Sequence, residues 1–177
     1  ASEIYDFAFR GQIRGPCAAL CRILAERIAS FVNRGIDLLQ ASGIPFVTLG
    51  RSDSGGSHSW IDLDFEGVMA TAVERLVRFG HRRIAVTLPS NDANYGAIFA
   101  QAYRDNLARH GLDVDEGLVF PTRRQEDDGD SIVDGLLDRP DPATAIILFY
   151  EVTAIGIYRL LAERGLKPGR DLSIIGF

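Results

Sequence analysis

The sequence is short of cysteine and has no long apolar run, and each absence excludes a class of protein. Its 177 residues include two cysteines, Cys17 and Cys21, which are too few for a disulfide framework or a complete metal site. We therefore expect buried thiols in a reducing cytoplasm. No stretch approaches the about 18 consecutive apolar residues of a membrane span, so we expect no membrane partner. The opening residues ASEIYDFAFRGQIRG carry acids among apolar residues, unlike a secretory signal.

Basic residues are also in the minority. The chain has 19 Lys and Arg against 24 Asp and Glu, a formal net charge of −5. This balance argues against a nucleic-acid-binding surface within the chain itself. A hydrophobic content of 46% is ordinary for a globular protein with a sizeable core.

From residue 64 onward, helical and strand patterns alternate. Each helical stretch carries one apolar stripe, and each strand is a short apolar run. Asp64 is an expected N-cap, and Gly80, Gly111 and Gly165 are expected helix stops. Short connections between such elements predict an α/β fold with parallel strands covered by helices. The predicted helices are 64–80, 95–111, 130–140 and 152–165, and the predicted strands are 83–88, 117–121, 144–149 and 171–177.

The first forty residues do not follow this rhythm. Two stretches look helical, but no strand is evident before the run IPFVTLG at 44–50. Either an unusual connection occurs here or the numbering joins segments whose intervening residues are absent, and we favour the second. We expect a partial N-terminal lobe over residues 1–80 and a C-terminal lobe over 81–177 that is truncated after its last strand.

Polar and aromatic side chains follow the predicted strands. In open parallel sheets, ligands bind outside the carboxyl ends of the strands. Loops with amides, carboxylates and rings at this edge suit a polyhydroxylated small molecule, although polar residues are also what ordinary loops contain. The residues concerned are Asn91, Asp92, Asn94, Tyr95, Arg123, Arg124, Tyr150 and Glu151.

No pattern points to an enzyme. His81 and His110 lie beside helix-stopping glycines, and His58 lies in a Ser/Gly loop without the context of a nucleophile elbow. No glycine-rich phosphate loop follows a strand. The acidic run at 126–130 has no calcium-loop spacing and is expected to start a helix. We expect no catalytic residue, no metal and no cofactor.

Several blocks, in order, resemble the effector-binding core of the lactose/galactose-repressor family of bacterial transcription regulators. The resemblance covers residues 36–177. It implies a periplasmic-binding-protein-like fold of two doubly wound parallel-sheet lobes with a sugar-class effector between them, a homodimer, and an N-terminal helix-turn-helix headpiece that reads operator DNA. We expect that headpiece to lie outside this chain. The blocks are IPFVTLGR, FEGVMATAVERLVRFGHRRIAV, AYRDNLARHGL and TAIILFYEVTAIGIYRLLAERGLKPGRDLSIIGF.

The resemblance transfers unevenly to single residues. Tyr150 and Glu151 stand where many members have Asn-Asp, and Glu151 keeps the carboxylate. Phe99 stands where many members have a ligand-binding Arg, which argues against a phosphorylated or carboxylated effector unless Arg123 or Arg124 compensates.

We predict that Asn94, Tyr95, Phe99 and Glu151 line one effector site, with Tyr150 and Arg124 as further candidates. Arg51, Trp60 and Asp62 are the candidates from the other lobe, with a packed edge-strand aromatic as the alternative for Trp60.

The sequence thus predicts the ligand-sensing domain of a DNA-binding transcriptional regulator, which binds a sugar or related effector and alters operator affinity. The alternative is a sugar-binding protein of a transport system with the same fold. A helix-turn-helix preceding this chain would support the regulator, and a signal peptide would support the transport protein.

Overall fold

Two compact units make up the chain, Ala1–Leu63 (unit 1) and Asp64–Phe177 (unit 2). The predictions for Cys17 and Cys21 lie outside the described residues. The computed structural model describes residues 34–43, 45–52, 58–90, 94–123, 125 and 128–176.

Unit 1 contains a helix over residues 34–41 and a two-stranded parallel sheet. β1 (Val47–Leu49) lies within the predicted strand, and β2 (Ser59–Ile61) contains Trp60, for which a position in an edge strand was the alternative prediction. Leu49 is paired with Ile61, and the Leu49 side chain is 91% exposed. By itself, this sheet therefore buries little of its apolar surface.

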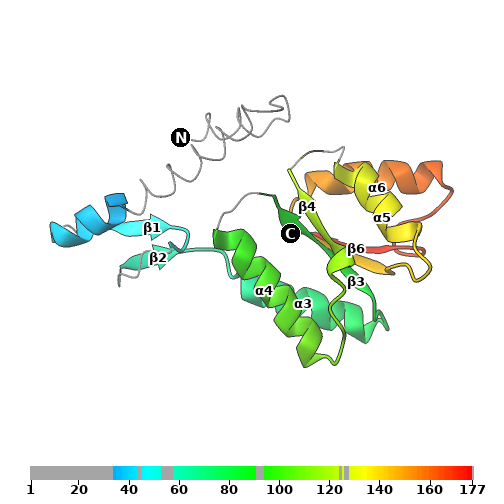
Figure 1. Cartoon of the computed structure of the whole chain (residues 1–177), viewed down its shortest axis with the longest axis horizontal. Helices are drawn as coiled ribbons and strands as arrows, with labels where there is room; N and C mark the ends of the chain where they lie inside the picture. Colours follow the sequence, from blue (N-terminus) through cyan, green and yellow to red (C-terminus); the bar gives the residue numbers. More distant parts are fainter. Residues whose placement is uncertain are drawn as a thin grey trace. The chain divides into compact units, whose positions relative to one another are not determined.

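Unit 2 alternates strands and helices along the chain (Figure 1). Each strand and helix predicted after residue 64 is present, with ends shifted by a few residues. The elements are α3 (Phe65–Arg78), β3 (Ile84–Pro89), α4 (Asn94–Arg109), the short 3-10 helix η1 (Glu116–Leu118), β4 (Val119–Thr122), α5 (Asp128–Leu137), β5 (Ala145–Leu148), α6 (Val152–Glu163) and β6 (Ser173–Gly176).

The sheet of unit 2 has the order β4-β3-β5-β6, and all its pairings are parallel. This confirms the predicted α/β fold with parallel strands. The chain leaves β3 toward β4 on one side and leaves β5 toward β6 on the other. The direction of winding therefore reverses between β3 and β5, which is the position where open α/β sheets bind ligands.

Two apolar layers cover the two faces of this sheet. Successive residues of a strand point to opposite faces of the sheet, so they pack in opposite layers. Ile147 packs in the layer beneath α3 and α4, whereas its neighbours Ile146 and Leu148 pack in the layer beneath α5 and α6. Figure 1 shows the α5–α6 pair apart from the α3–α4 pair.

The two ends of α3 form as predicted. The helix belongs to unit 2, although it was predicted to belong to the N-terminal lobe. The Asp64 carboxylate accepts a hydrogen bond from the Gly67 amide at 2.9 Å, which caps the helix. Gly80 follows with a φ of 93°, a conformation that suits glycine at a helix end. The two compact units divide after Leu63, whereas the predicted lobe boundary at residue 80 places α3 in the first lobe. The assignment of the units to two lobes stays a prediction.

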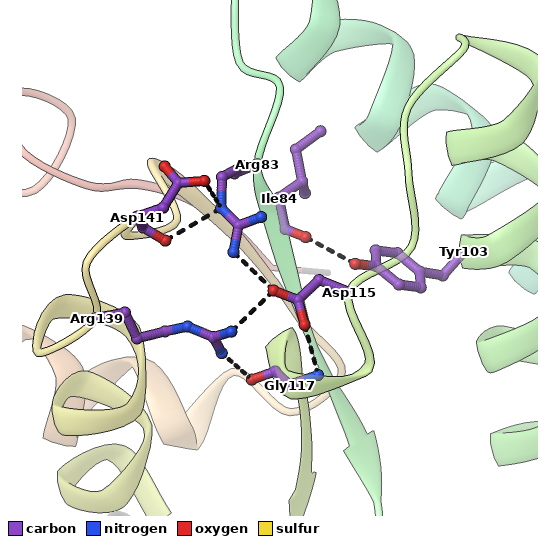
Figure 2. A network of polar contacts seen from close by, with 7 residues as sticks. All are labelled: Arg83, Ile84, Tyr103, Asp115, Gly117, Arg139 and Asp141. Atoms are coloured by element: carbon purple, nitrogen blue, oxygen red, sulfur yellow. Dashed lines mark hydrogen bonds and ion pairs between the residues drawn. The ribbon is translucent and has the colours of Figure 1, made fainter.

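A polar network joins the loops at the amino ends of β3, β4 and β5 (Figure 2). The Asp115 carboxylate accepts hydrogen bonds from Arg83 at 2.7 Å and from Arg139 at 2.8 Å, and its second oxygen accepts one from the Gly117 amide at 2.9 Å. Arg83 also contacts the Asp141 carboxylate at 3.0 Å. Three loops distant in sequence are thereby tied together at one edge of the sheet.

Tyr103 anchors α4 to β3 beside this network. Its hydroxyl donates a 2.7 Å hydrogen bond to the Ile84 carbonyl, and burial raises the pKa of Tyr103 to about 12. Tyr103→Phe leaves this buried carbonyl without its donor, so we expect a loss of about 1–2 kcal/mol in the free energy of unfolding. Urea denaturation measures the change, with Tyr158→Phe on the half-exposed surface of α6 as the control. Equal stability of the two variants would contradict this role.

We expect Asp115 to make the stability of the fold depend on pH in the acidic range. The hydrogen bond from Arg83, followed by that from the Gly117 amide, holds the pKa of Asp115 below its ordinary value. A folded pKa below the unfolded one means that the carboxylate stabilises the fold at neutral pH, and this contribution is lost as the pH falls below about 4. We expect Asp115→Asn to lower the melting temperature at pH 7, and the difference from wild type to narrow toward pH 3.

Thermal melts across this pH range test the prediction. Asp113→Asn, at an exposed position of the same loop, is the matched control. A deficit of Asp115→Asn that is constant with pH would show that the ion pairs do not contribute.

Candidate functional site

The candidate site lies at the carboxyl edge of the unit 2 sheet, where the winding reverses. The loop after β3 leads to Asn94 and Tyr95 in the first turn of α4, and β5 is followed by Phe149, Tyr150 and Glu151. Because β3 and β5 are parallel neighbours, both sets leave the sheet at the same edge. The sheet thus groups four of the six unit 2 candidates, Asn94, Tyr95, Tyr150 and Glu151, around one position.

Five aromatic rings gather here, and we call them the ring cluster: Phe65, Tyr95, Phe99, Phe149 and Tyr150. Phe149 is central. Its ring stacks on Tyr95 with centroids 5.5 Å apart and on Phe65 at 5.8 Å. Phe99 and Tyr150 meet it edge-on, each at 4.9 Å. Offset-stacked and edge-to-face pairs are the stable arrangements of such rings.

The rings of the cluster differ in burial. Phe65 and Phe99 are buried, whereas Tyr95, Phe149 and Tyr150 are half-buried. Phe99 was predicted to line the site, but its side chain has no exposed area, so in this structure it packs behind the other rings. Apolar ring surface at the edge of a rigid sheet suits the C–H face of a ligand.

Phe65 and Phe149 belong to the cluster although neither was predicted as a site residue. Phe149 was assigned to the preceding strand, and its position at the end of a buried apolar run was the available signal. The fully buried Thr87 hydroxyl of β3 accepts a 2.8 Å hydrogen bond from the Phe149 amide. This bond fixes the chain where it leaves β5.

Glu151 brings a carboxylate to this edge. It occupies the N-cap position of α6 in a helical backbone conformation, and its side chain makes no capping hydrogen bond. The residue is exposed. A carboxylate that is not used by its own helix is suited to accept hydrogen bonds from ligand hydroxyls.

Asp128 organises the loop after β4. Its carboxylate accepts hydrogen bonds from the amides of Arg123 at 2.7 Å and Gln125 at 3.1 Å, and it pairs with the Arg123 guanidinium at 3.3 Å. Asp128 is 5% exposed and starts α5, which confirms that the acidic run begins a helix. Arg123 is therefore held by a carboxylate of its own loop, and Arg124 lies outside the described residues.

In unit 1, the three predicted residues contact one another. The Asp62 carboxylate accepts hydrogen bonds from the Arg51 amide at 3.0 Å and from its guanidinium at 3.3 Å. The same guanidinium lies 5.3 Å from the centre of the Trp60 ring, which is 50% exposed. Arg51 and Asp62 follow the carboxyl ends of β1 and β2, so this cluster occupies the equivalent edge of its own sheet.

Two of the three histidines contact threonine hydroxyls. His58 contacts the Thr48 hydroxyl at 3.0 Å and stacks on Phe46, and His81 contacts the Thr144 hydroxyl at 2.8 Å. Burial lowers the pKa of His81. His110 is exposed in the turn after α4. Among the described residues, no three His, Cys, Asp or Glu side chains gather as a metal site would require, and no helix is long and apolar enough to cross a membrane.

Two open grooves of about 540 Å³ and 460 Å³ lie elsewhere in unit 2, along α3 and β6. The polar residues that line the larger one already serve α3, because Asp64 caps the helix and Arg75 stacks on Phe79. Neither groove combines rings with an uncommitted carboxylate, so the ring cluster is the stronger candidate.

Comparison with known proteins identifies the family. Residues 73–177, more than half of the chain, match the periplasmic binding protein-like domain. The transcriptional regulator AglR of Rhizobium meliloti is 32% identical over 141 residues, which are 79% of this chain and 40% of that protein. The regulator RafR of Escherichia coli is 34% identical over 134 residues, which are 75% of this chain and 39% of that protein.

Solved structures agree with these relatives. A LacI-family regulatory protein from Chloroflexus aggregans matches with a TM-score of 0.74 and 33% identity, over 80% of this chain and 51% of that one. A sugar-binding LacI-family regulator from Escherichia coli, solved with phosphate, matches with a TM-score of 0.72 and 29% identity, over 82% of this chain and 52% of that one.

The chain spans about 40% of the length of the curated relatives described above and about half of each solved structure. The family resemblance and the fold class predicted from the sequence are confirmed. The chain belongs to the family of periplasmic binding protein-like domains, and the proteins to which it is similar are transcriptional regulators, including a LacI-family regulatory protein.

Proposed function

We propose that this chain is part of the ligand-sensing domain of a DNA-binding transcriptional regulator and that it binds a sugar-class effector. The observation that carries the proposal is the combination of the ring cluster with the Glu151 carboxylate at the reversal point of the unit 2 sheet. Rings contact the apolar face of a sugar, and carboxylate and amide groups satisfy its hydroxyls once water is removed. The similarity to regulators, one of them described as sugar-binding, supports the same assignment.

In the intact protein, the effector lies between two lobes, as the family resemblance implies. The candidate ligand-binding residues of unit 2 are Asn94, Tyr95, Tyr150 and Glu151, and those of unit 1 are Arg51, Trp60 and Asp62. A ligand that contacts both lobes favours one lobe arrangement over another and thereby changes the spacing of two DNA-binding headpieces. The protein acts in the cytoplasm. It acts as a homodimer, because the two-fold symmetry of a dimer matches a near-palindromic operator. It binds without catalytic turnover.

Effector binding should change operator affinity. A thermal shift screen of sugars first identifies the one that raises the melting temperature of the intact protein most. We then compare the Kd of the intact protein for DNA from upstream of its own gene without this sugar and with the sugar at saturation. We expect the two Kd values to differ. The reason is that a ligand with unequal affinity for two lobe arrangements shifts the balance between them. Fluorescence anisotropy of the labelled DNA measures both values. Identical values would contradict a sensing role.

Loss of the Glu151 carboxylate should weaken effector binding. Glu151→Gln keeps the size of the side chain but removes a charged acceptor, and Asn94→Ala removes an amide. We expect each change to cost roughly 1–3 kcal/mol of binding free energy, the usual loss for a polar contact in a desolvated site. Calorimetric titration with the same sugar gives the values.

The matched control is Glu163→Gln at the opposite end of α6, where the carboxylate is also exposed. Its affinity should equal that of wild type. Unchanged affinity in both Asn94→Ala and Glu151→Gln would show that these loops only connect the elements of the sheet.

A further inference from the structure

We infer that Thr87 is a positioning residue of the proposed sensing site, because its buried hydroxyl holds the Phe149 amide at the point where β3 and β5 separate. The turn that this bond fixes carries Tyr150 and Glu151. Thr87 has no exposed area, so it acts through the turn and does not contact the effector. This inference deepens the proposed function and rests on it.

A hydroxyl is unusual at the position of Thr87. The neighbouring residues of β3 are apolar, and apolar layers cover both faces of the sheet. Valine has nearly the same shape and would bury no polar group there. A buried hydroxyl costs free energy unless it is hydrogen-bonded. The 2.8 Å hydrogen bond from the Phe149 amide offsets this cost, so it is this bond, and not packing, that accounts for the hydroxyl.

The bond follows the last backbone pairing between β3 and β5. That pairing ends at Val86 and Ile147. Beyond it, β3 continues beside β4, and β5 continues beside β6. The side chain of Thr87, the next residue of β3, then accepts the bond from the Phe149 amide. Thr87 thus joins the two strands where they begin to diverge, which is where ligands bind in open α/β sheets.

Phe149 is held through its side chain as well as through its backbone. Its ring stacks on Tyr95 and Phe65 and meets Phe99 edge-on. Because these rings pack on one another, they anchor Phe149 in the sheet. Recognition then falls to the residues that follow it.

The turn after Phe149 leads directly into α6. The Tyr150 carbonyl accepts a hydrogen bond from the Thr153 amide at 3.2 Å, which begins the helix. A shift of the Phe149 backbone therefore moves the start of α6, and with it the exposed Glu151 carboxylate. Hydrogen bonds to a ligand weaken steeply with poor distance and angle, so such a shift lowers affinity.

The test removes the hydroxyl and then restores it. Thr87→Val removes the acceptor of the Phe149 amide, whereas Thr87→Ser keeps it. A thermal shift screen of hexoses, pentoses and common disaccharides selects the sugar that stabilises the intact wild-type protein most, and calorimetric titration measures its Kd for each variant. We expect Thr87→Val to raise this Kd about 10-fold and Thr87→Ser to stay within about 2-fold of wild type.

Tyr103→Phe is the matched control for stability. Its hydroxyl donates to the Ile84 carbonyl, so this variant also loses a buried hydrogen bond of β3, but at the amino end of the strand. We expect a lower melting temperature and a wild-type Kd. An equal rise of the Kd in Tyr103→Phe and Thr87→Val would reflect a general loss of stability and would overturn the positioning role.

A double-mutant cycle tests whether Thr87 acts through the turn. Thr87→Val should cost less affinity in a Glu151→Gln background than in wild type, because the carboxylate that Thr87 positions is already absent. Additive losses would show that the two residues act independently and would overturn the inference.

The remaining outcomes separate this inference from the proposed function. If wild type and Thr87→Val bind the selected sugar equally, the inference is overturned and a sensing role stays intact. If no sugar of the panel binds the wild type, both are contradicted. If Thr87→Val does not fold, Thr87→Ser and Thr87→Ala replace it in the comparison, because they differ by the hydroxyl alone. A higher Kd for Thr87→Ala than for Thr87→Ser then supports the role, and equal values overturn it.

Discussion

β3 and β5 pair in parallel, with Ile84 beside Ala145 and Val86 beside Ile147, although β4 lies between them in the sequence. This pairing brings together two loops that the chain separates by an entire strand and two helices. It also makes the winding reverse between these strands, so that α4 starts over one face of the sheet and α6 over the other. In open α/β sheets, ligands bind in the crevice outside the carboxyl ends of the strands, at the point where the winding reverses. The grouping of Asn94, Tyr95, Tyr150 and Glu151 at one edge of the sheet depends on this pairing.

The two edges of the same sheet have different chemistry. At the amino edge, Asp115 joins Arg83 and Arg139, so cations and anions neutralise one another and hold loops together (Figure 2). At the carboxyl edge, rings pack together and the Glu151 carboxylate is left exposed and without a capping role. Polar groups that are already paired stabilise the fold, whereas an unused acceptor beside apolar surface is available to a ligand. The amino edge therefore joins loops through paired charges, whereas the carboxyl edge combines packed rings with an exposed carboxylate.

Unit 1 repeats part of this pattern on a smaller scale. Trp60 supplies exposed ring surface beside the Arg51–Asp62 pair, at the carboxyl edge of two parallel strands. Each unit, taken by itself, therefore combines an aromatic ring with a carboxylate at the carboxyl edge of its own parallel sheet.

The sequence by itself determined the local elements of unit 2. Apolar stripes, the Asp64 cap and the stop at Gly80 depend on neighbours a few residues apart, and they predicted α3 and the elements after it. It also indicated Tyr95, Tyr150 and Glu151, because they follow strands. Only the tertiary structure decided that Phe149 is the centre of a ring cluster and that Phe99 is buried beneath it. Burial and ring contacts arise from residues far apart in the chain, and the strand order that brings them together leaves no local signal in the sequence.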